Sequence, residues 1–212
     1  MKYYLILSNN ERSYEYLKLL IQNKKKPISC IHLDIKNKKI FRSKILYLIN
    51  REKISYKCFK DDNIDQKKII NFLLNLKEKI FVYSGYTSKI IKNKHILNKK
   101  ILLHSHTGKL PEFKGSTTIY YSLIKNKKIY CSTFIMNNEI DKGRILLIKK
   151  YGLIKQIKNI DKYDSQIRAK NMLSTLNNFN QLIKSKRRYV NKDNNSHYFI
   201  IHPILRYIAL KN

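Results

Sequence analysis

Residues 101–115 read ILLHSHTGKLPEFKG and join a short apolar run to a polar loop that carries two glycines. The run at 101–106 suits a buried strand, and two histidines fall at its carboxyl end. In open α/β sheets, ligands bind in the crevice beyond the carboxyl ends of the strands. This stretch therefore predicts a strand whose last side chains face a ligand site.

Apolar runs alternate with helical stripes on both sides of this strand. Further strands are expected at residues 2–7, 28–33, 55–59, 80–84, 131–136 and 145–149, and helices around 16–21, 45–49, 69–76, from 116, and from about 161 to 182. An apolar segment at 198–201 closes the chain. The alternation predicts an α/β protein with a mainly parallel central sheet flanked by helices. Because no linker rich in glycine or proline interrupts it, we expect a single domain over residues 1–212, with 186–212 as a C-terminal extension packed on it.

The chain carries a formal net charge of +31, from 45 lysines and arginines against 14 acidic residues. Such an excess ordinarily indicates a polyanionic partner. Here it is mostly lysine, spread over the whole length, and accompanied by many isoleucines, asparagines and tyrosines, the residue types that A/T-rich codons encode. A bias in base composition therefore accounts for the charge, and we do not expect nucleic acid as a partner. The positive field would still attract a small anionic substrate.

No apolar run is long enough to cross a bilayer, and the amino-terminal stretch MKYYLILSNNERS turns polar too early for a signal peptide. We therefore expect a cytoplasmic protein without a membrane partner. The cysteines, Cys30, Cys58 and Cys131, are too far apart for a metal site or a disulfide framework. Buried free thiols are expected instead.

Two segments together match a known motif: HSHTGKLPEFKG at 104–115, and DKG at 141–143. They resemble the folate-dependent formyltransferases, whose hallmark is Asn-x-His-x-(Ser/Gly)-x-Leu-Pro-x-x-x-Gly followed by Asp-x-Gly. The resemblance implies the Rossmann-like formyltransferase fold. It also implies transfer of a formyl group from formyltetrahydrofolate to a primary amine, with no metal.

The resemblance implies a role for each motif residue. His106 would act as general acid and base, and Asp141 would orient it and stabilise its charged form. A set of loop residues would hold the pterin, namely Tyr86, Thr87, Ser88, Met136, Asn137, Asn138, Glu139 and Ile140. The hydroxyl side chains of Ser116, Thr117 and Thr118 would face the amine substrate.

One motif position departs from the family pattern, because His104 stands where the family has a catalytic asparagine. The asparagine amide donates to the oxyanion of the intermediate, and an imidazole N–H can do the same. His104 is therefore expected to be catalytic, although the replacement would also fit a degenerate enzyme. A zinc site would be another use of the His104–His106 pair, but no third ligand follows at a diagnostic spacing.

Sequence patterns outside the catalytic motif narrow the choice of amine substrate. The turn at 8–13, SNNERS, lacks the glycine-rich phosphate loop of members that act on glycinamide ribonucleotide, and the chain has no room for the extra domain of those that formylate methionyl-tRNA. Residues 115–122 and 198–208 resemble members that formylate nucleotide-linked amino sugars in surface-glycan synthesis. That substrate is our prediction, and a homodimer is left open. The alternatives are another amine, either a ribonucleotide or methionyl-tRNA, and a catalytically degenerate basic protein that binds nucleic acid.

Two groups have simple structural interpretations. The hydroxyls at 116–118 could cap the helix that follows them. Asp164 and Arg168 have the spacing of an ion pair on a helix surface.

Overall fold

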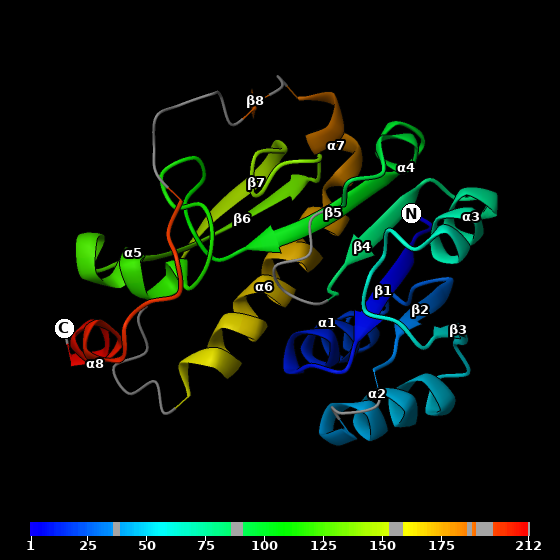
Figure 1. The fold of residues 1–212 in the computed structure, drawn as a ribbon, viewed down its shortest axis with the longest axis horizontal. Helices are drawn as coiled ribbons and strands as arrows, with labels where there is room; N and C mark the ends of the chain where they lie inside the picture. Colours follow the sequence, from blue (N-terminus) through cyan, green and yellow to red (C-terminus); the bar gives the residue numbers. More distant parts are fainter. Residues whose placement is uncertain (36–38, 86–90, 153–158, 186–187, 190–196, 212) are drawn as a thin grey trace. The chain divides into compact units, whose positions relative to one another are not determined.

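The computed structural model describes residues 1–35, 39–85, 91–152, 159–185, 188–189 and 197–211. The described chain is an α/β protein with a mainly parallel sheet flanked by helices, as predicted (Figure 1). It divides into two compact units, which are residues 1–104 with 136–138, and residues 105–135 with 139–212. They are called the first and the second unit below. The single domain expected over residues 1–212 stays a prediction.

The first unit is built on parallel strands in the order β3-β2-β1-β4-β5. These strands are β1 (Tyr4–Ser8), β2 (Ser29–Leu33), β3 (Ser55–Phe59), β4 (Ile80–Tyr83) and β5 (Ile101–His106), whose last two residues belong to the second unit. The order reverses between β1 and β4, where Ser13 donates a hydrogen bond to the Ser84 carbonyl at 2.7 Å. Such a reversal opens the crevice that doubly wound sheets use for ligands.

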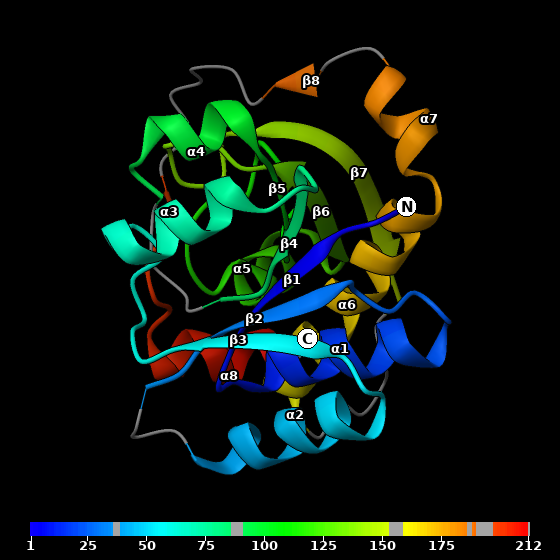
Figure 2. The same cartoon turned by 90° about the vertical axis from the view of Figure 1, so that its right-hand side faces the viewer.

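Helices cover both faces of these strands. They are α1 (Glu11–Gln22), α2 (Lys39–Arg51), α3 (Lys67–Asn75) and α4 (Lys94–Lys99). Figure 2 shows α1 and α2 together on one side of β1–β3, and α3 and α4 on the other. Helix α1 begins where the Asn10 side chain accepts a hydrogen bond from the Ser13 amide at 2.8 Å, a standard N-cap. Alternate residues of β1 face the two helical layers, so Leu5, Ile6 and Leu7 are all fully buried.

The second unit contains antiparallel strands and four helices. The strands are β6 (Ile129–Ile135), β7 (Arg144–Tyr151) and β8 (Arg188–Tyr189), and the helices are α5 (Thr118–Asn126), α6 (Ile160–Asn177), α7 (Phe179–Lys184) and α8 (Pro203–Lys211). The apolar core of this unit joins Leu123 of α5, Ile167 of α6 and Ala209 of α8. Burial of these side chains is the main force that holds the unit together.

The structure corrects several predicted elements. The helix expected from 161 to 182 is two helices, because Asn178 ends α6 by donating its side-chain amide to the Ser174 carbonyl at 2.9 Å. Helix α5 begins at Thr118 and not at residue 116. Helices α4 and α8 were not predicted. No helix in the described part of the chain is long and apolar enough to cross a membrane.

One cysteine differs from its prediction. Cys30 and Cys131 are buried free thiols, and burial raises the pKa of both. Cys58, however, is exposed. It lies on β3, the outermost strand of the first unit, most of whose side chains are exposed, so the apolar pattern around it does not report a buried site.

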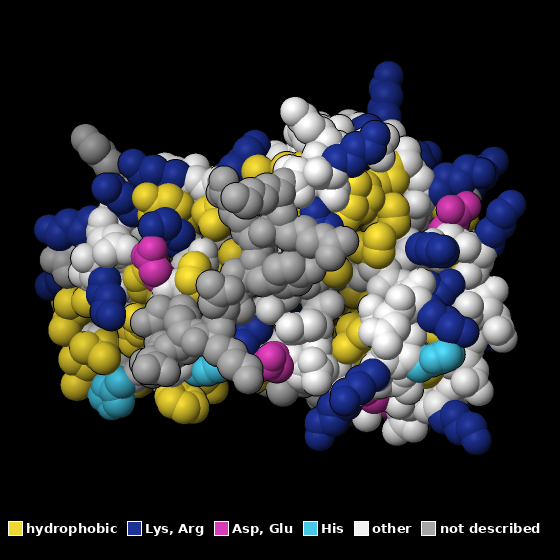
Figure 3. Space-filling model, turned by 90° about the horizontal axis from the view of Figure 1, so that it is seen from above, with side chains coloured by type: hydrophobic (Ala, Val, Ile, Leu, Met, Phe, Trp, Pro, Cys, Tyr) yellow, Lys and Arg dark blue, Asp and Glu magenta, His cyan; other side chains and the backbone are white. Residues whose placement is uncertain are grey.

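One face of the protein shows its positive charge in a dispersed form. Figure 3 shows lysine and arginine side chains spread across the visible face, with few acidic side chains among them. A dispersed charge is consistent with the base-composition interpretation, because it does not form a single groove-shaped recognition surface.

Candidate active site

The second unit brings the two central motif residues together. His106 ends β5 and is 3% exposed, and its Nδ1 lies 3.4 Å from Oδ2 of Asp141, which is 8% exposed. Its Nε2 lies 2.8 Å from the Phe113 carbonyl oxygen and 3.1 Å from the Thr118 hydroxyl. A buried imidazole and a buried carboxylate therefore face each other across a short gap.

These contacts fix where the imidazole carries its protons. The Phe113 carbonyl can only accept a hydrogen bond, so Nε2 of His106 must donate to it. The Thr118 hydroxyl donates to the Thr107 carbonyl and so accepts from the same Nε2–H. Neutral His106 consequently turns an unprotonated Nδ1 towards the Asp141 carboxylate. Any proton that His106 gains is held between Nδ1 and Asp141.

Burial and charge act on His106 in opposite directions. Desolvation lowers the pKa of His106 below its ordinary value, and the nearby Asp141 carboxylate opposes that shift. Burial is the larger influence, so the pKa is lowered and the resting side chain is a neutral base at neutral pH. A group in this state can accept a proton from an attacking nucleophile.

Asp141 is held by its own turn and by the motif loop. Its backbone has a φ of +53°, which is uncommon for a residue with a side chain, and Oδ2 accepts a hydrogen bond from the Gly115 amide at 2.8 Å. Gly143 allows this turn, because a β-carbon there would lie 1.8 Å from the Ile135 carbonyl oxygen. Gly115 and Gly143, one from each motif segment, thus help to position the Asp141 carboxylate.

A pair of side chains from α6 holds the backbone on either side of His106. Arg168 donates to the Ser105 carbonyl at 2.8 Å and pairs with Asp164 at 2.7 Å, and Asp164 accepts from the Thr107 hydroxyl. The sequence predicted only a surface ion pair here. The i, i+4 spacing was a correct signal for the pair, but it could not reveal that the pair reaches the end of β5.

The hydroxyl residues after the loop separate into two groups. Thr118 contacts His106, as described above, whereas Thr117 donates to the Phe199 carbonyl and accepts from the Ile201 amide. The Ser116 amide donates to the Tyr198 carbonyl at 2.7 Å. Thr117 occupies the N-cap position of α5 with no side-chain capping bond, so the capping interpretation was wrong. Binding of the amine by Ser116, Thr117 and Thr118 stays a prediction.

The residues expected to hold the pterin are placed in part. Tyr86, Thr87 and Ser88 lie outside the described residues. Met136 packs against the core of the first unit, and its amide donates to the Leu102 carbonyl at 2.8 Å. Asn137 and Asn138 follow it in the first unit, whereas Glu139 and Ile140 are exposed and belong to the second. Their contact with folate stays a prediction.

His104 is described by its contacts in the first unit. Its Nδ1 lies 3.1 Å from the Tyr83 carbonyl oxygen, so Nδ1 carries a proton and donates to it. The other ring nitrogen, Nε2, then has a proton to donate only when the ring is charged. This constraint is absent from an asparagine, whose amide always donates.

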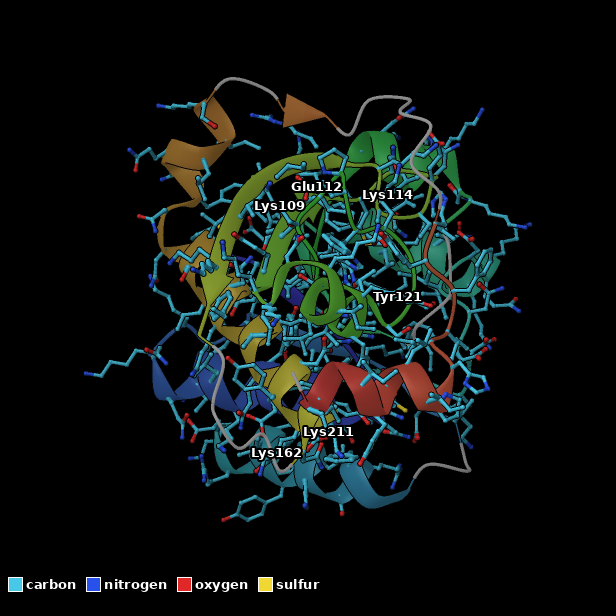
Figure 4. All side chains as sticks on the ribbon, turned by 90° about the vertical axis from the view of Figure 1, so that its left-hand side faces the viewer. Lys109, Glu112, Lys114, Tyr121, Lys162 and Lys211 are labelled. Carbon is cyan, nitrogen blue, oxygen red and sulfur yellow. The ribbon has the colours of Figure 1, made fainter. Side chains whose placement is uncertain are left out.

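The motif loop also carries charged side chains outside the buried pair. Lys109 and Glu112 form an exposed ion pair at 2.6 Å (Figure 4). Among the described residues, no group of three or more histidine, cysteine, aspartate or glutamate side chains is placed to hold a metal ion.

Known proteins share the arrangement of these elements. No model of a protein family matches the chain. Methionyl-tRNA formyltransferase of Helicobacter pylori (strain P12) is 26% identical over 181 residues, and the match covers 79% of this chain and 57% of that protein. The chain thus spans just over half the length of this curated relative.

Three solved structures illustrate the likeness. A 4-N formyltransferase from Francisella tularensis has a TM-score of 0.63 and 15% identity, covering 99% of this chain and 87% of that one. Phosphoribosylglycinamide formyltransferase from Anaplasma phagocytophilum has a TM-score of 0.66 and 16% identity, covering 92% and 97%. The N-formyltransferase from Helicobacter canadensis, solved with folinic acid and dTDP-3-aminofucose, has a TM-score of 0.59 and 17% identity, covering 93% and 71%. The chain has the formyltransferase fold. The resemblance that the motif indicated is therefore confirmed in the fold, and the formyltransferase fold places His106 at the end of its strand β5.

Proposed function

We propose that the protein is a folate-dependent N-formyltransferase that moves a formyl group from formyltetrahydrofolate to a primary amine. The observation that carries this proposal is the buried contact between His106 and Asp141, made by both halves of the motif on a formyltransferase fold. The 26% identity to a methionyl-tRNA formyltransferase supports the same class of reaction.

The buried pair suits the proton transfers of this reaction. The amine nitrogen forms a bond to the formyl carbon, the bond from that carbon to the folate nitrogen breaks, and one proton moves from the amine to the leaving nitrogen. His106, neutral at rest, takes the proton, and Asp141 stabilises the imidazolium through Nδ1. The pair then returns the proton to the leaving nitrogen. Charge never accumulates on an unpartnered buried group.

Formyltetrahydrofolate supplies the activated formyl group when it is bound. The carbonyl oxygen of that group becomes an oxyanion in the tetrahedral intermediate, and we propose that His104 donates Nε2–H to it. Because Nδ1 of His104 is committed to the Tyr83 carbonyl, this donation requires the charged ring.

The activity can be tested directly with purified protein. Formyltetrahydrofolate and a candidate amine should yield tetrahydrofolate, which is followed by its absorbance, together with the N-formyl product, which is followed by mass spectrometry. His106→Ala should abolish turnover, whereas Gly152→Ala, in open space far along the chain, should not change it. No turnover with any amine, and no saturable folate binding, would remove the proposal.

For the amine we propose an amino-sugar nucleotide of surface-glycan synthesis. The solved N-formyltransferase from Helicobacter canadensis, bound to dTDP-3-aminofucose, supports this choice, and the +31 charge favours an anionic substrate. A panel of amino-sugar nucleotides, glycinamide ribonucleotide and methionyl-tRNA, compared by kcat/KM, discriminates between the candidates. Preference for methionyl-tRNA, the substrate named for the Helicobacter pylori relative, would select the alternative amine.

The degenerate nucleic-acid-binding protein remains the alternative from another class, because His104 replaces the donor asparagine and the charge is high. It predicts RNA or DNA binding that falls steeply with salt and is unchanged in His106→Ala. The absence of turnover together with such binding would favour it over the enzyme. Cytoplasmic location, metal independence and the lack of a membrane partner stay predictions.

We further propose a homodimer formed through α8. One face of this helix packs on α5 through Ala209, while Ile204 and Tyr207 are 64% and 58% exposed. Exposed apolar side chains that lie together ordinarily mark an interaction surface. Since two copies of a +31 chain repel each other, dimerisation should strengthen as salt rises.

Sedimentation velocity tests the dimer. The double variant Ile204→Glu/Tyr207→Glu should sediment as a monomer at salt concentrations at which the natural chain is dimeric. Gln181→Glu, which adds a carboxylate to the exposed surface of α7, is the control and should stay dimeric. A natural chain that is monomeric at every salt concentration contradicts this part of the proposal.

A further inference from the structure

Helices α1 and α2 lie side by side in the first unit (Figure 2). Side chains of both helices line a groove. It has a volume of about 490 Å³, within the range of small-molecule sites. Its lining combines cationic, aromatic and amide or hydroxyl side chains, contributed by Tyr14, Lys18, Gln22, Ser43, Lys44, Tyr47, Leu48 and Arg51. None of these residues belongs to the unit that holds His106 and Asp141.

Two lysines from different helices converge on one aromatic ring of this groove. Nζ of Lys18 lies 5.8 Å from the centre of the Tyr14 ring, and Nζ of Lys44 lies 5.9 Å from it. Among the described residues, no acidic side chain lines the groove, and neither lysine forms an ion pair. Nζ of Lys44 also lies 5.5 Å from the centre of the Phe41 ring. Both ammonium groups lie at this groove, so each can attract an anionic ligand that binds there.

The next turns of α2 provide a flat aromatic surface beside these cations. Tyr47 follows Lys44 by three residues on the same face of the helix and is 63% exposed. Arg51 stacks over the Tyr47 ring at 5.7 Å, and Glu52 neutralises it at 3.0 Å. The groove therefore offers unneutralised charge at Lys18 and Lys44, and an accessible ring one turn further along.

We propose that this groove binds a nucleoside phosphate. The phosphate lies between Lys18 and Lys44, and the base stacks on Tyr47, since base–aromatic stacking and lysine–phosphate attraction are the usual components of such sites. Gln22 and Ser43 supply hydrogen bonds at the edges. This site goes beyond the proposed formyl transfer and does not depend on it.

Titration of the ¹⁵N-labelled full chain with ADP tests the site, because chemical shifts localise binding to particular residues. We expect saturable shifts at the amides of α1 and α2. Pyrophosphate, which has the charge but no base, should bind about tenfold more weakly, and adenosine should produce little shift at these helices. Groove binding that is equal for ADP and pyrophosphate would overturn the nucleoside part of the proposal.

Matched variants separate the groove from the general positive field. Lys18→Gln/Lys44→Gln should weaken ADP binding at α1 and α2 by about tenfold or more. Lys94→Gln/Lys99→Gln removes the same charge from exposed positions on α4 and should change it less than twofold. Equal losses in the two double variants, or ADP shifts confined to other elements, would overturn the proposal.

A third titration, with a single-stranded octanucleotide, distinguishes a free nucleotide from nucleic acid as the ligand. A single-stranded octanucleotide should bind the groove no more than about tenfold more tightly than ADP, the gain expected from additional phosphate contacts outside the site. If the octanucleotide binds more than a hundredfold more tightly and depends on Lys18 and Lys44, the ligand is nucleic acid, and the small-molecule proposal is wrong.

Discussion

Gly108 lies directly against His106: a β-carbon at position 108 would lie 2.8 Å from Nε2 of the imidazole and 2.7 Å from the Phe113 carbonyl oxygen. The same nitrogen donates to that carbonyl. A glycine is therefore needed for the imidazole, the carbonyl and the loop to occupy their positions together.

Gly108→Ala should leave the chain folded but displace the His106 ring. We expect kcat for formyl transfer to fall by about a hundredfold, the usual cost of misplacing a catalytic group by about 1 Å. Thermal denaturation should show a modest loss of stability. Gly152→Ala, whose added carbon meets no other described residue within 4 Å apart from its chain neighbours, serves as the control. Unchanged kcat in Gly108→Ala would mean that His106 needs no fixed position.

The pH dependence of turnover reports the state of His106. Because burial lowers the pKa of His106, the neutral base should persist to lower pH than in a free imidazole. The rate therefore rises with pH along an acidic limb whose midpoint lies below about 6.5. Asp141→Asn removes the carboxylate that raises this pKa, so the limb should move to still lower pH while kcat falls.

The control for that profile is Glu112→Gln, which removes an exposed carboxylate paired only with Lys109 in the same loop. Its acidic limb should coincide with that of the natural chain. A limb in Asp141→Asn that stays in place, or moves to higher pH, would contradict the assignment of the limb to His106.

The lowered pKa of a buried histidine also affects the stability of the fold. An imidazole whose pKa is lowered by folding takes up protons more readily in the unfolded chain, so the free energy of unfolding falls as pH drops below the unfolded pKa of about 6.5. His32, which is fully buried and also has a lowered pKa, contributes in the same direction. His32→Gln should flatten the pH dependence of the melting temperature between about pH 6.5 and 5. It should leave kcat unchanged, because His32 lies on β2 of the first unit and contacts Asn9.

Arg168 should be a positioning residue for His106. It reaches the Ser105 carbonyl on one side, and through Asp164 it reaches Thr107 on the other. Arg168→Gln should cost about 1.5–3 kcal/mol of unfolding free energy, typical of a hydrogen bond to a charged group, and should lower kcat more than it raises KM.

Arg206 supplies the comparison for Arg168. It pairs with Asp161 at 2.9 Å and donates to the Tyr120 hydroxyl at 2.6 Å, but it does not touch the backbone beside His106. Arg206→Gln should therefore lower stability and leave kcat unchanged. Equal loss of kcat in the two variants would show that Arg168 acts through general stability.

Much of the fold could be predicted from apolar patterns, because local propensity and burial agree there. The strand at Ile101–His106 has the predicted bounds, since it is a short buried run between Lys100 and Thr107. The strand at Ser55–Phe59 also has its predicted bounds, although most of its side chains are exposed. The contact between His106 and Asp141 was also accessible, because two motif segments with fixed spacing imply one site. Helix α8 was missed, although Pro203 at its first position is a favoured start of a helix.

The partners of particular polar groups could not be predicted, because they depend on elements far apart in the sequence. Thr117 looks like a helix cap, yet its hydroxyl bonds the segment at Phe199 and Ile201. Arg168 looks like a surface residue, yet it bonds Ser105. In both cases the sequence allows the polar side chain to bond either to water or to a distant segment, and only the tertiary structure shows which partner it has.

His104 departs from the formyltransferase motif, and replacing it with the motif's asparagine tests whether the departure is functional. Neutral His104 donates from Nδ1 to the Tyr83 carbonyl and has no proton on Nε2. Oxyanion stabilisation by this residue therefore requires a second proton on the ring. An asparagine amide donates without any change of protonation, so His104→Asn should keep or raise kcat.

The variant His104→Ala tests whether His104 donates a hydrogen bond to the oxyanion or is only accommodated at this position. Loss of one oxyanion donor typically lowers kcat by about 10²–10³-fold, so the alanine variant should be slower than the natural chain by up to that factor. The asparagine variant should recover most of that rate. If the alanine and asparagine variants have the same kcat and the same pH profile as the natural chain, His104 donates nothing to the intermediate, and the oxyanion must be stabilised by other groups.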